Sequence, residues 1–138
     1  MFLLDTNVIS ELRRPDKADR NVVAWANAAP AANFFMSVIS ILEIEIGTRF
    51  IERRDAAQGA ILRTWINTQV LARFEGRILA IDTAVAQRCA QLHVPNPRAE
   101  RDALVAATAL VHSLTVVTRN VGDFEPTGVP YLNPWDAA

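Results

Sequence analysis

Four acidic residues that are far apart in the sequence each stand near the predicted end of a strand or the start of a helix. They are Asp5, Glu43, Asp102 and Asp123. In an open parallel sheet, ligands bind beyond the carboxyl ends of the strands, so these side chains are expected to meet in one crevice. Converging carboxylates repel one another and either take up protons or bind cations, and hard oxygen ligands suit Mg²⁺ or Mn²⁺. The pattern predicts a divalent-metal site able to activate water beside a phosphodiester.

Each acid also has an interpretation that involves no chemistry. Asp5 stands where an aspartate commonly caps a helix, and Asp102 would complement the dipole of its own helix. Glu43 is harder to explain in this way, because it lies among isoleucine and leucine residues, where a carboxylate is costly without a partner. Glu45 competes with Glu43 in the same helix, but two residues turn a helix by about 200°. Glu45 is therefore expected to face solvent.

Apolar runs alternate with helical patterns along the chain and indicate the elements that position these acids. Strands are predicted over 1–4, 33–38, 77–81 and 114–117, with a short edge strand over 130–132. Helices are predicted over 8–12, 20–29, 41–54, 55–71, 83–93 and 100–112. Strands separated by helices need parallel crossover connections. The predicted fold is therefore α/β, a doubly wound α/β/α sandwich with a short parallel sheet, and Asp123 is expected in the loop 118–123 after the fourth strand.

Local signals within these segments give finer expectations. The predicted helix N-caps are Asp19, Ser37 or Ser40, Asp55, and Asp82 or Thr83. In the helix over 55–71, residues at i, i+3 and i+4 spacing form one apolar stripe, which consists of Ile61, Leu62, Trp65, Ile66, Val70 and Leu71.

Length and composition restrict the class of protein. The chain has 138 residues, 51% of them hydrophobic and 21% charged, which indicates a single domain over 1–138 with a real core. With one cysteine no internal disulfide can form, and neither a signal peptide nor a membrane span is apparent, so a cytoplasmic protein is expected. The net charge of −1 argues against a general nucleic-acid coat. It leaves room for a nuclease with an acidic site.

Several other side chains could take part in chemistry. Cys89 lies between small residues of a helix and is interpreted as a buried hydrophobe, while His93 and His112 suit helix C-terminal ends. Histidine and cysteine show no zinc-ligand spacing, so a zinc site is not expected. A set of arginines could line an RNA path or could simply be solvated at helix ends; it consists of Arg13, Arg14, Arg49, Arg53 and Arg54.

Four blocks in the right order, and a short tail, resemble PIN-domain proteins, in particular the VapC and FitB-like toxins of bacterial toxin–antitoxin pairs. The blocks are Met1–Leu12, Ser37–Gly47, Arg101–Ala109 and Val117–Phe124, and the tail is Asn133–Trp135. The segment 55–74 carries little of the family pattern. The four acids fall on the family's acidic positions.

The resemblance implies a metal-dependent endoribonuclease. Asp5, Asp102 and Asp123 would hold Mg²⁺ or Mn²⁺, with Glu43 binding directly or through water, and an activated water would attack phosphorus in line. Three further residues would orient the carboxylates or contact phosphate, and each could equally serve only turns and caps. They are Asn7, Thr118 and Asn120.

The resemblance also implies partners. A cognate antitoxin would hold the toxin, place a basic side chain in the acidic crevice and supply the contact with operator DNA. Family members commonly form homodimers, and the apolar helices near Ile41–Phe50 and Trp65 are candidate contact surfaces. A plain core role for these residues is the alternative.

Other functions fit the residues less well. A phosphotransfer receiver domain would need an acidic pair after the first strand and a late lysine, but Lys17 is the last lysine. A haloacid-dehalogenase-type phosphatase would need aspartate where Asn7 stands. The remaining alternative is a catalytically silent PIN-type module that acts with an antitoxin on operator DNA. The intact set of four acids argues against that module.

Overall fold

The computed structural model describes residues 1–136, so the last two residues of the predicted domain over 1–138 lie outside the described part. Its described residues form one parallel sheet in the order β3-β2-β1-β4-β5. The strands are β1 (Phe2–Leu4), β2 (Phe34–Ser37), β3 (Ile78–Leu79), β4 (Thr115–Val117) and β5 (Tyr131–Leu132). All five lie in segments that the sequence predicts as strands. The short parallel sheet is confirmed.

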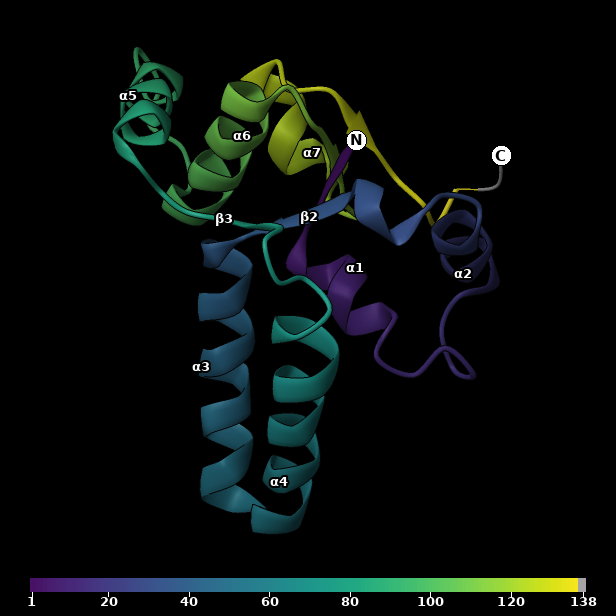
Figure 1. The fold of residues 1–138 in the computed structure, drawn as a ribbon. Helices are drawn as coiled ribbons and strands as arrows, with labels where there is room; N and C mark the ends of the chain where they lie inside the picture. The colour runs from purple at the N-terminus through teal and green to yellow at the C-terminus, as the bar shows by residue number, and fades with distance from the viewer. Residues whose placement is uncertain (137–138) are drawn as a thin grey trace.

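Helices cover both faces of the sheet, which confirms the predicted α/β/α sandwich (Figure 1). The helices are α1 (Thr6–Glu11), α2 (Arg20–Asn27), α3 (Val38–Arg54), α4 (Ala56–Trp65), α5 (Thr83–Leu92), α6 (Glu100–His112) and α7 (Val121–Phe124). Short helical turns add Ala31–Asn33, the π-helical segment Ile66–Leu71, and Glu125–Thr127. In Figure 1, α5, α6 and α7 lie on one side of the strands, and α1, α3 and α4 on the other.

The two faces of the central strands build two separate cores. Leu3 and Val116 pack with the residues of α5, α6 and α7, whereas Leu4 and Val117 pack with those of α1, α3 and the π-helical segment. Successive strand residues point to opposite faces, so a three-residue strand can serve both layers. This double burial explains why the strands are continuous apolar runs rather than alternating ones.

Besides α1, which Asp5 caps, four of the helices described begin with a side-chain cap. The oxygens of Asp19, Ser37, Asp55 and Asp82 accept backbone N–H groups at the starts of α2, α3, α4 and α5. These caps confirm the predicted positions and decide the two open pairs, since Ser37 rather than Ser40, and Asp82 rather than Thr83, makes the hydrogen bond. Such caps satisfy N–H groups that have no partner inside the helix.

Helices α3 and α4 form an antiparallel hairpin that projects away from the sheet (Figure 1). Arg63 on α4 pairs with Glu45 at 2.8 Å and with Glu52 at 3.2 Å, both on α3. The expectation that Glu45 faces solvent is therefore wrong. The helical rotation between residues 43 and 45 does place Glu45 on a different side of α3 from Glu43. However, α4 covers the side on which Glu45 lies.

The predicted apolar stripe of the helix over 55–71 is only partly correct. Ile66 and Val70 are buried, but Ile61 and Leu71 are exposed. The outer side of α4 has no layer against it, because the hairpin extends beyond the sheet (Figure 1). The π-helical segment also changes the angular position of residues 66–71 relative to a regular α-helix. A regular helix of 3.6 residues per turn, assumed over residues 55–71, therefore gives the wrong burial at both ends of the stripe.

None of the helices described is long and apolar enough to cross a membrane.

Candidate active site

The candidate site lies where the strand order reverses. From β1 the chain builds β2 and β3 on one side, and β4 and β5 lie on the other side of β1. In open parallel sheets such a switch point opens a crevice at the carboxyl ends of the two central strands. Asp5 follows β1 and Thr118 follows β4, and the N–H of Asp5 donates to the carbonyl oxygen of Val117 at 2.9 Å. The chain topology therefore brings both residues to the head of this crevice.

Asp5 is both a helix cap and a fixed carboxylate of the crevice. The residue as a whole is only 8% exposed. Its Oδ1 accepts the N–H of Thr6 at 2.9 Å, and its Oδ2 accepts the hydroxyl of Thr118 at 2.9 Å. A helix cap needs only one carboxylate oxygen of Asp5. The second oxygen is held by Thr118, which follows the neighbouring strand β4.

Asn7 and Thr118 connect the two strand ends. The amide of Asn7 donates to Thr118 Oγ1 at 3.3 Å and lies 3.5 Å from Asp5 Oδ2, and its Oδ1 accepts the N–H of Arg119 at 3.3 Å. Asn120 contributes its backbone N–H to Thr118 Oγ1 at 3.0 Å, while its own side chain is exposed. The structure therefore ties Asn7 and Thr118 directly to Asp5. Their roles in phosphate or metal contacts stay predictions.

Glu43 is held by residues that the sequence analysis did not single out. The Thr6 hydroxyl donates to Glu43 Oε1 at 2.7 Å and lies 3.0 Å from the Ser40 hydroxyl. Arg101 Nη1 lies 3.7 Å from Glu43 Oε2. These partners explain how Glu43 is tolerated among apolar neighbours. Two signals were available in the sequence, since Thr6 adjoins Asp5 and Ser40 precedes Glu43 by one helical turn.

Asp102 and Asp123 lie close together, and the charges of Asp5 and Glu43 reach Asp102. Asp102 lies in the first turn of α6, as predicted, and lines a hollow of about 220 Å³ together with Asp123. Asp123 belongs to the short helix α7 rather than to a loop, which corrects the sequence-based expectation. Phe124 is fully buried in the core, and this anchor folds the segment after β4 into a helical turn.

The charges of neighbouring acids raise the pKa of two of the four carboxyl groups, Asp5 and Asp102. Burial raises the pKa of Asp5, and the nearby charges of Glu43 and Asp123 raise it further, against the opposing hydrogen bonds from Thr118 and Thr6. Burial also raises the pKa of Asp102, with added contributions from Asp123, Asp5 and Glu43. Like charges assembled at such a site favour protonation or a cation.

The donor set fits a hard divalent cation. It consists of carboxylate oxygens, and Arg101 provides one positive charge beside Glu43. No three of the carboxylates described bring one oxygen each within 4.8 Å of one another. Mg²⁺ usually keeps several of its waters, so carboxylates spaced in this way suit binding partly through water. Mutual repulsion gives the carboxylates a physical reason to stand apart without a cation.

Cys89, His93 and Glu100 do bring their ligand atoms within 4.8 Å of one another, which their sequence spacing did not indicate. However, Nδ1 of His93 accepts the N–H of Arg98 at 3.1 Å. The neutral ring then carries its proton on Nε2, the nitrogen that lies 3.7 Å from Glu100 Oε2, and a protonated nitrogen cannot ligate a metal. Burial and Glu100 also raise the pKa of the Cys89 thiol. As arranged, the group does not form a metal centre.

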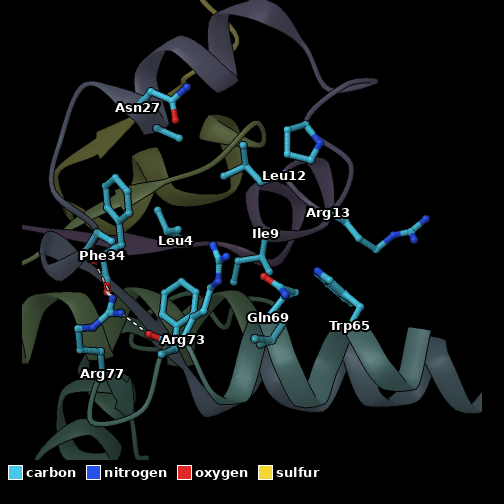
Figure 2. A pocket seen from close by; sticks show the side chains of 15 residues that line it. Leu4, Ile9, Leu12, Arg13, Asn27, Phe34, Trp65, Gln69, Arg73 and Arg77 are labelled. Atoms are coloured by element: carbon cyan, nitrogen blue, oxygen red, sulfur yellow. Dashed lines mark hydrogen bonds between the residues drawn. The ribbon is translucent and has the colours of Figure 1, made fainter. Parts of the chain in front are cut away.

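A larger hollow of about 440 Å³ lies apart from the acids and is lined by α1, α2, α4 and the following π-helical segment (Figure 2). Its walls include Leu4, Ile9, Phe34 and Trp65. Arginines rim it, among them Arg77, whose guanidinium donates to backbone carbonyl oxygens (Figure 2). None of its lining residues is acidic. Its character is apolar and cationic, opposite to that of the candidate active site.

Comparison with known proteins identifies the class to which this fold and site belong. The chain belongs to the PIN-domain family, which matches residues 2–126. It is 37% identical to Toxin FitB of Neisseria gonorrhoeae, over 98% of this chain and 99% of that protein. It is also 32% identical to VapC ribonuclease Y4jK of Sinorhizobium fredii, over the full length of both.

Solved structures agree with this assignment. The crystal structure of FitAcB from Neisseria gonorrhoeae contains a chain that is 36% identical, with a TM-score of 0.90 over 99% of this chain and 100% of that chain. A toxin–antitoxin complex from Klebsiella pneumoniae contains a chain that is 25% identical, with a TM-score of 0.68 over 99% of this chain and 100% of that chain. The predicted family and fold are confirmed.

Proposed function

We propose that this protein is a Mg²⁺- or Mn²⁺-dependent endoribonuclease and the toxin of a toxin–antitoxin pair. The observation that carries the proposal is that acidic side chains gather at the switch point, where Thr118 holds Asp5 and Thr6 holds Glu43. Burial and neighbouring acids raise the pKa of Asp5 and Asp102 there. Relatives named Toxin FitB and VapC ribonuclease Y4jK support RNA as the substrate and toxicity as the outcome. A cytoplasmic location follows from that substrate.

The four acidic residues are the proposed metal ligands. Asp5, Asp102 and Asp123 hold the cation, with Glu43 binding directly or through water. A cation held there would supply an activated water and a positive charge against the charge that builds on the phosphate. Hydrolysis joins the water oxygen to phosphorus and breaks the bond to the 3′ oxygen, which leaves a 5′-phosphate and a 3′-hydroxyl.

The neighbouring side chains fix the carboxylates before the substrate arrives. Thr118 holds one oxygen of Asp5 and Thr6 holds one oxygen of Glu43, so neither carboxylate is free to rotate away. Such orienting partners tune both the affinity and the geometry of a metal site. Arg101, beside Glu43 and exposed, is placed to contact an RNA phosphate. Asn7 reinforces the link between Asp5 and Thr118, and Asn120 contributes through its backbone.

The partner is a cognate antitoxin, and operator DNA is reached only through it. Solved structures titled as FitAB bound to a DNA fragment and as a toxin–antitoxin complex support this arrangement. The apolar hollow with its arginine rim (Figure 2) suits an apolar segment that carries acidic residues. A basic antitoxin side chain would then neutralise the acidic site. The chain's own net charge of −1 fits a protein that does not bind DNA by itself.

A homodimer contact is proposed on the outer side of α3. Leu42 is exposed there, whereas Ile44 on the opposite side belongs to the core and Trp65 packs against it. We therefore propose that one side of the segment Ile41–Phe50 makes the dimer contact, while its other side belongs to the core.

The proposal is tested by incubating the purified protein with RNA in Mg²⁺, in EDTA, and after the substitution Asp5→Asn. Cleavage that needs the metal and is lost in Asp5→Asn is the expected result. Cleavage that survives both treatments would show a contaminant or a different site. A protein that cleaves nothing but still assembles with an antitoxin on DNA would be the catalytically silent module instead.

A further inference from the structure

A second hollow of about 580 Å³ opens directly from the acidic site. It lies between α1, α3 and α4, and Thr6 and Glu43 form its wall on the side of the acids. Arg13 and Arg54 also line it, together with Phe50 and other residues of the three helices. One continuous hollow therefore connects a carboxylate of the proposed metal centre to two guanidinium groups.

The two arginines in this hollow carry charge that the protein does not use internally. Within residues 1–136, neither Arg13 nor Arg54 has a carboxylate at ion-pair distance; the arginines that do are Arg63 and Arg101. Guanidinium groups bind phosphate oxygens through pairs of parallel N–H donors. The two arginines therefore suit an anionic ligand. Because the acids beside the hollow would repel an anion, such a ligand would bind there together with a cation.

The size and lining of the hollow suit a nucleotide. Ligand-binding cavities usually enclose about 300–1,000 Å³, and this one lies within that range. Phe50, 66% exposed, and Trp65 both line it and offer aromatic faces, on which bases of single strands stack without regard to sequence. Arg13 and Trp65 lie at the border between this hollow and the apolar one (Figure 2).

Gly47 keeps the hollow open. It lies inside the long helix α3, where glycine costs about 0.5–1 kcal/mol relative to alanine. A Cβ atom added to Gly47 would meet nothing within 4 Å, so the helix packing does not require glycine there. Because Gly47 lines the hollow, a larger side chain would enter the space. We therefore explain the glycine at position 47 by the space that the hollow needs for a ligand.

We propose that this hollow binds the nucleotide of a single-stranded RNA that adjoins the phosphate to be cleaved. Arg13 and Arg54 hold its backbone phosphates and Phe50 stacks on its base. The inference rests on the proposed function, since it assigns a substrate subsite to that same active site. It also separates the arginines named from the sequence, because Arg49 and Arg53 line a different hollow along α3, which Phe50 borders as well.

The test measures RNA affinity separately from cleavage. A fluorescein-labelled single-stranded RNA of randomised sequence, about ten nucleotides long, is titrated with the Asp5→Asn protein in Mg²⁺. Into this background are added Arg13→Gln, Arg54→Gln or Gly47→Leu. The matched controls are Arg53→Gln, which makes the same charge change one residue away, and Gly47→Ala, which leaves most of the space free.

The three hollow variants are expected to raise Kd about tenfold each, while both controls stay within about twofold. The two arginine variants should also reduce the salt dependence of binding by about one phosphate contact. Equal affinities across the set, in a protein whose unsubstituted form cleaves RNA, would overturn the subsite and leave the proposed function standing. If the hollow variants keep RNA affinity but lose an antitoxin partner, the hollow serves protein binding and the inference is wrong. Failure of the proposed function would instead appear as no cleavage by the unsubstituted protein.

Discussion

The hydroxyl of Thr118 donates to Oδ2 of Asp5 at 2.9 Å and joins the ends of two neighbouring strands that lie 113 residues apart in the sequence. Both residues are buried. The bond favours the ionised form of Asp5 and so works against burial, which raises the pKa of that carboxyl. It is the clearest case in this protein of a side chain that prepares a carboxylate for a cation.

Replacing Thr118 with valine, which has nearly the same shape, should shift the pH dependence of RNA cleavage. Without the hydroxyl the pKa of Asp5 rises further, so the acidic limb of the kcat/KM profile moves to higher pH. The lost bond should also lower the free energy of unfolding by about 1–3 kcal/mol. Thr115→Val, at the start of the strand that Thr118 follows and away from the acids, is the control. An unchanged acidic limb would show that the hydroxyl does not tune Asp5.

Thr6 should control Glu43 in the same way. Thr6→Val removes the donor to Glu43 Oε1 and is expected to reduce kcat/KM about tenfold. Thr6→Ser keeps the hydroxyl and should restore most of the activity, whereas a loss of helix packing alone would affect both variants. Steady-state cleavage of a labelled RNA provides the measurement. Equal activity of the valine and serine variants would contradict this role for Thr6.

Stability without metal should depend on pH through the acidic cluster. Asp102 has a raised pKa in the folded state, so its contribution to stability is fully present below 3.8, its unfolded value, and is lost as the pH rises through the folded value. Asp102→Asn should therefore be more stable than the unsubstituted protein at pH 7 in EDTA, and the difference should shrink towards pH 4.

Urea denaturation at both pH values measures this difference. Saturating Mg²⁺ should reverse the order at pH 7, because the cation stabilises only the protein with the full set of acids. If Asp102→Asn is less stable at pH 7 in EDTA, the carboxylates do not strain the metal-free fold.

Two glycines of the α3–α4 hairpin should respond oppositely to alanine. A Cβ at Gly59 would lie 2.7 Å from the Cα of Glu52, so Gly59→Ala should force the helices apart and cost about 1–3 kcal/mol. Gly47 faces open space, so Gly47→Ala should stabilise the protein by about 0.5–1 kcal/mol. Thermal unfolding of the two variants side by side measures both effects. A stabilising Gly59→Ala would show that the hairpin packs more loosely than described.

The strands and the positions of the acids could be predicted because their signals are local. A short apolar run before Asp5 defines a strand, and helix caps such as Asp55 depend on the next three residues. The parallel-sheet rule then places Asp5 near the other acids without any knowledge of packing. Side-chain partners do not follow in this way. That Thr6 would reach Glu43 depends on how α1 lies on α3, which no periodicity encodes.

The errors have the same origin. Glu45 was expected in solvent because the angle between residues of one helix is known from sequence, whereas the helix that later covers it is not. Ile61 was expected in the core because the stripe shows which side of α4 is apolar but not where the covering layer ends. The π-helical segment Ile66–Leu71 matches no signal that the sequence analysis used.

The most direct test of the central claim is a count of bound Mn²⁺ by electron paramagnetic resonance on the purified protein. Binding is expected to be saturable and to fall at least about tenfold in each of the variants Asp5→Asn, Asp102→Asn and Asp123→Asn. Glu45→Gln, an equal charge change that removes only a partner of Arg63, should bind as the unsubstituted protein does. Mn²⁺ binding that is unaffected by all three aspartate substitutions, or equally weakened by Glu45→Gln, would contradict the central claim.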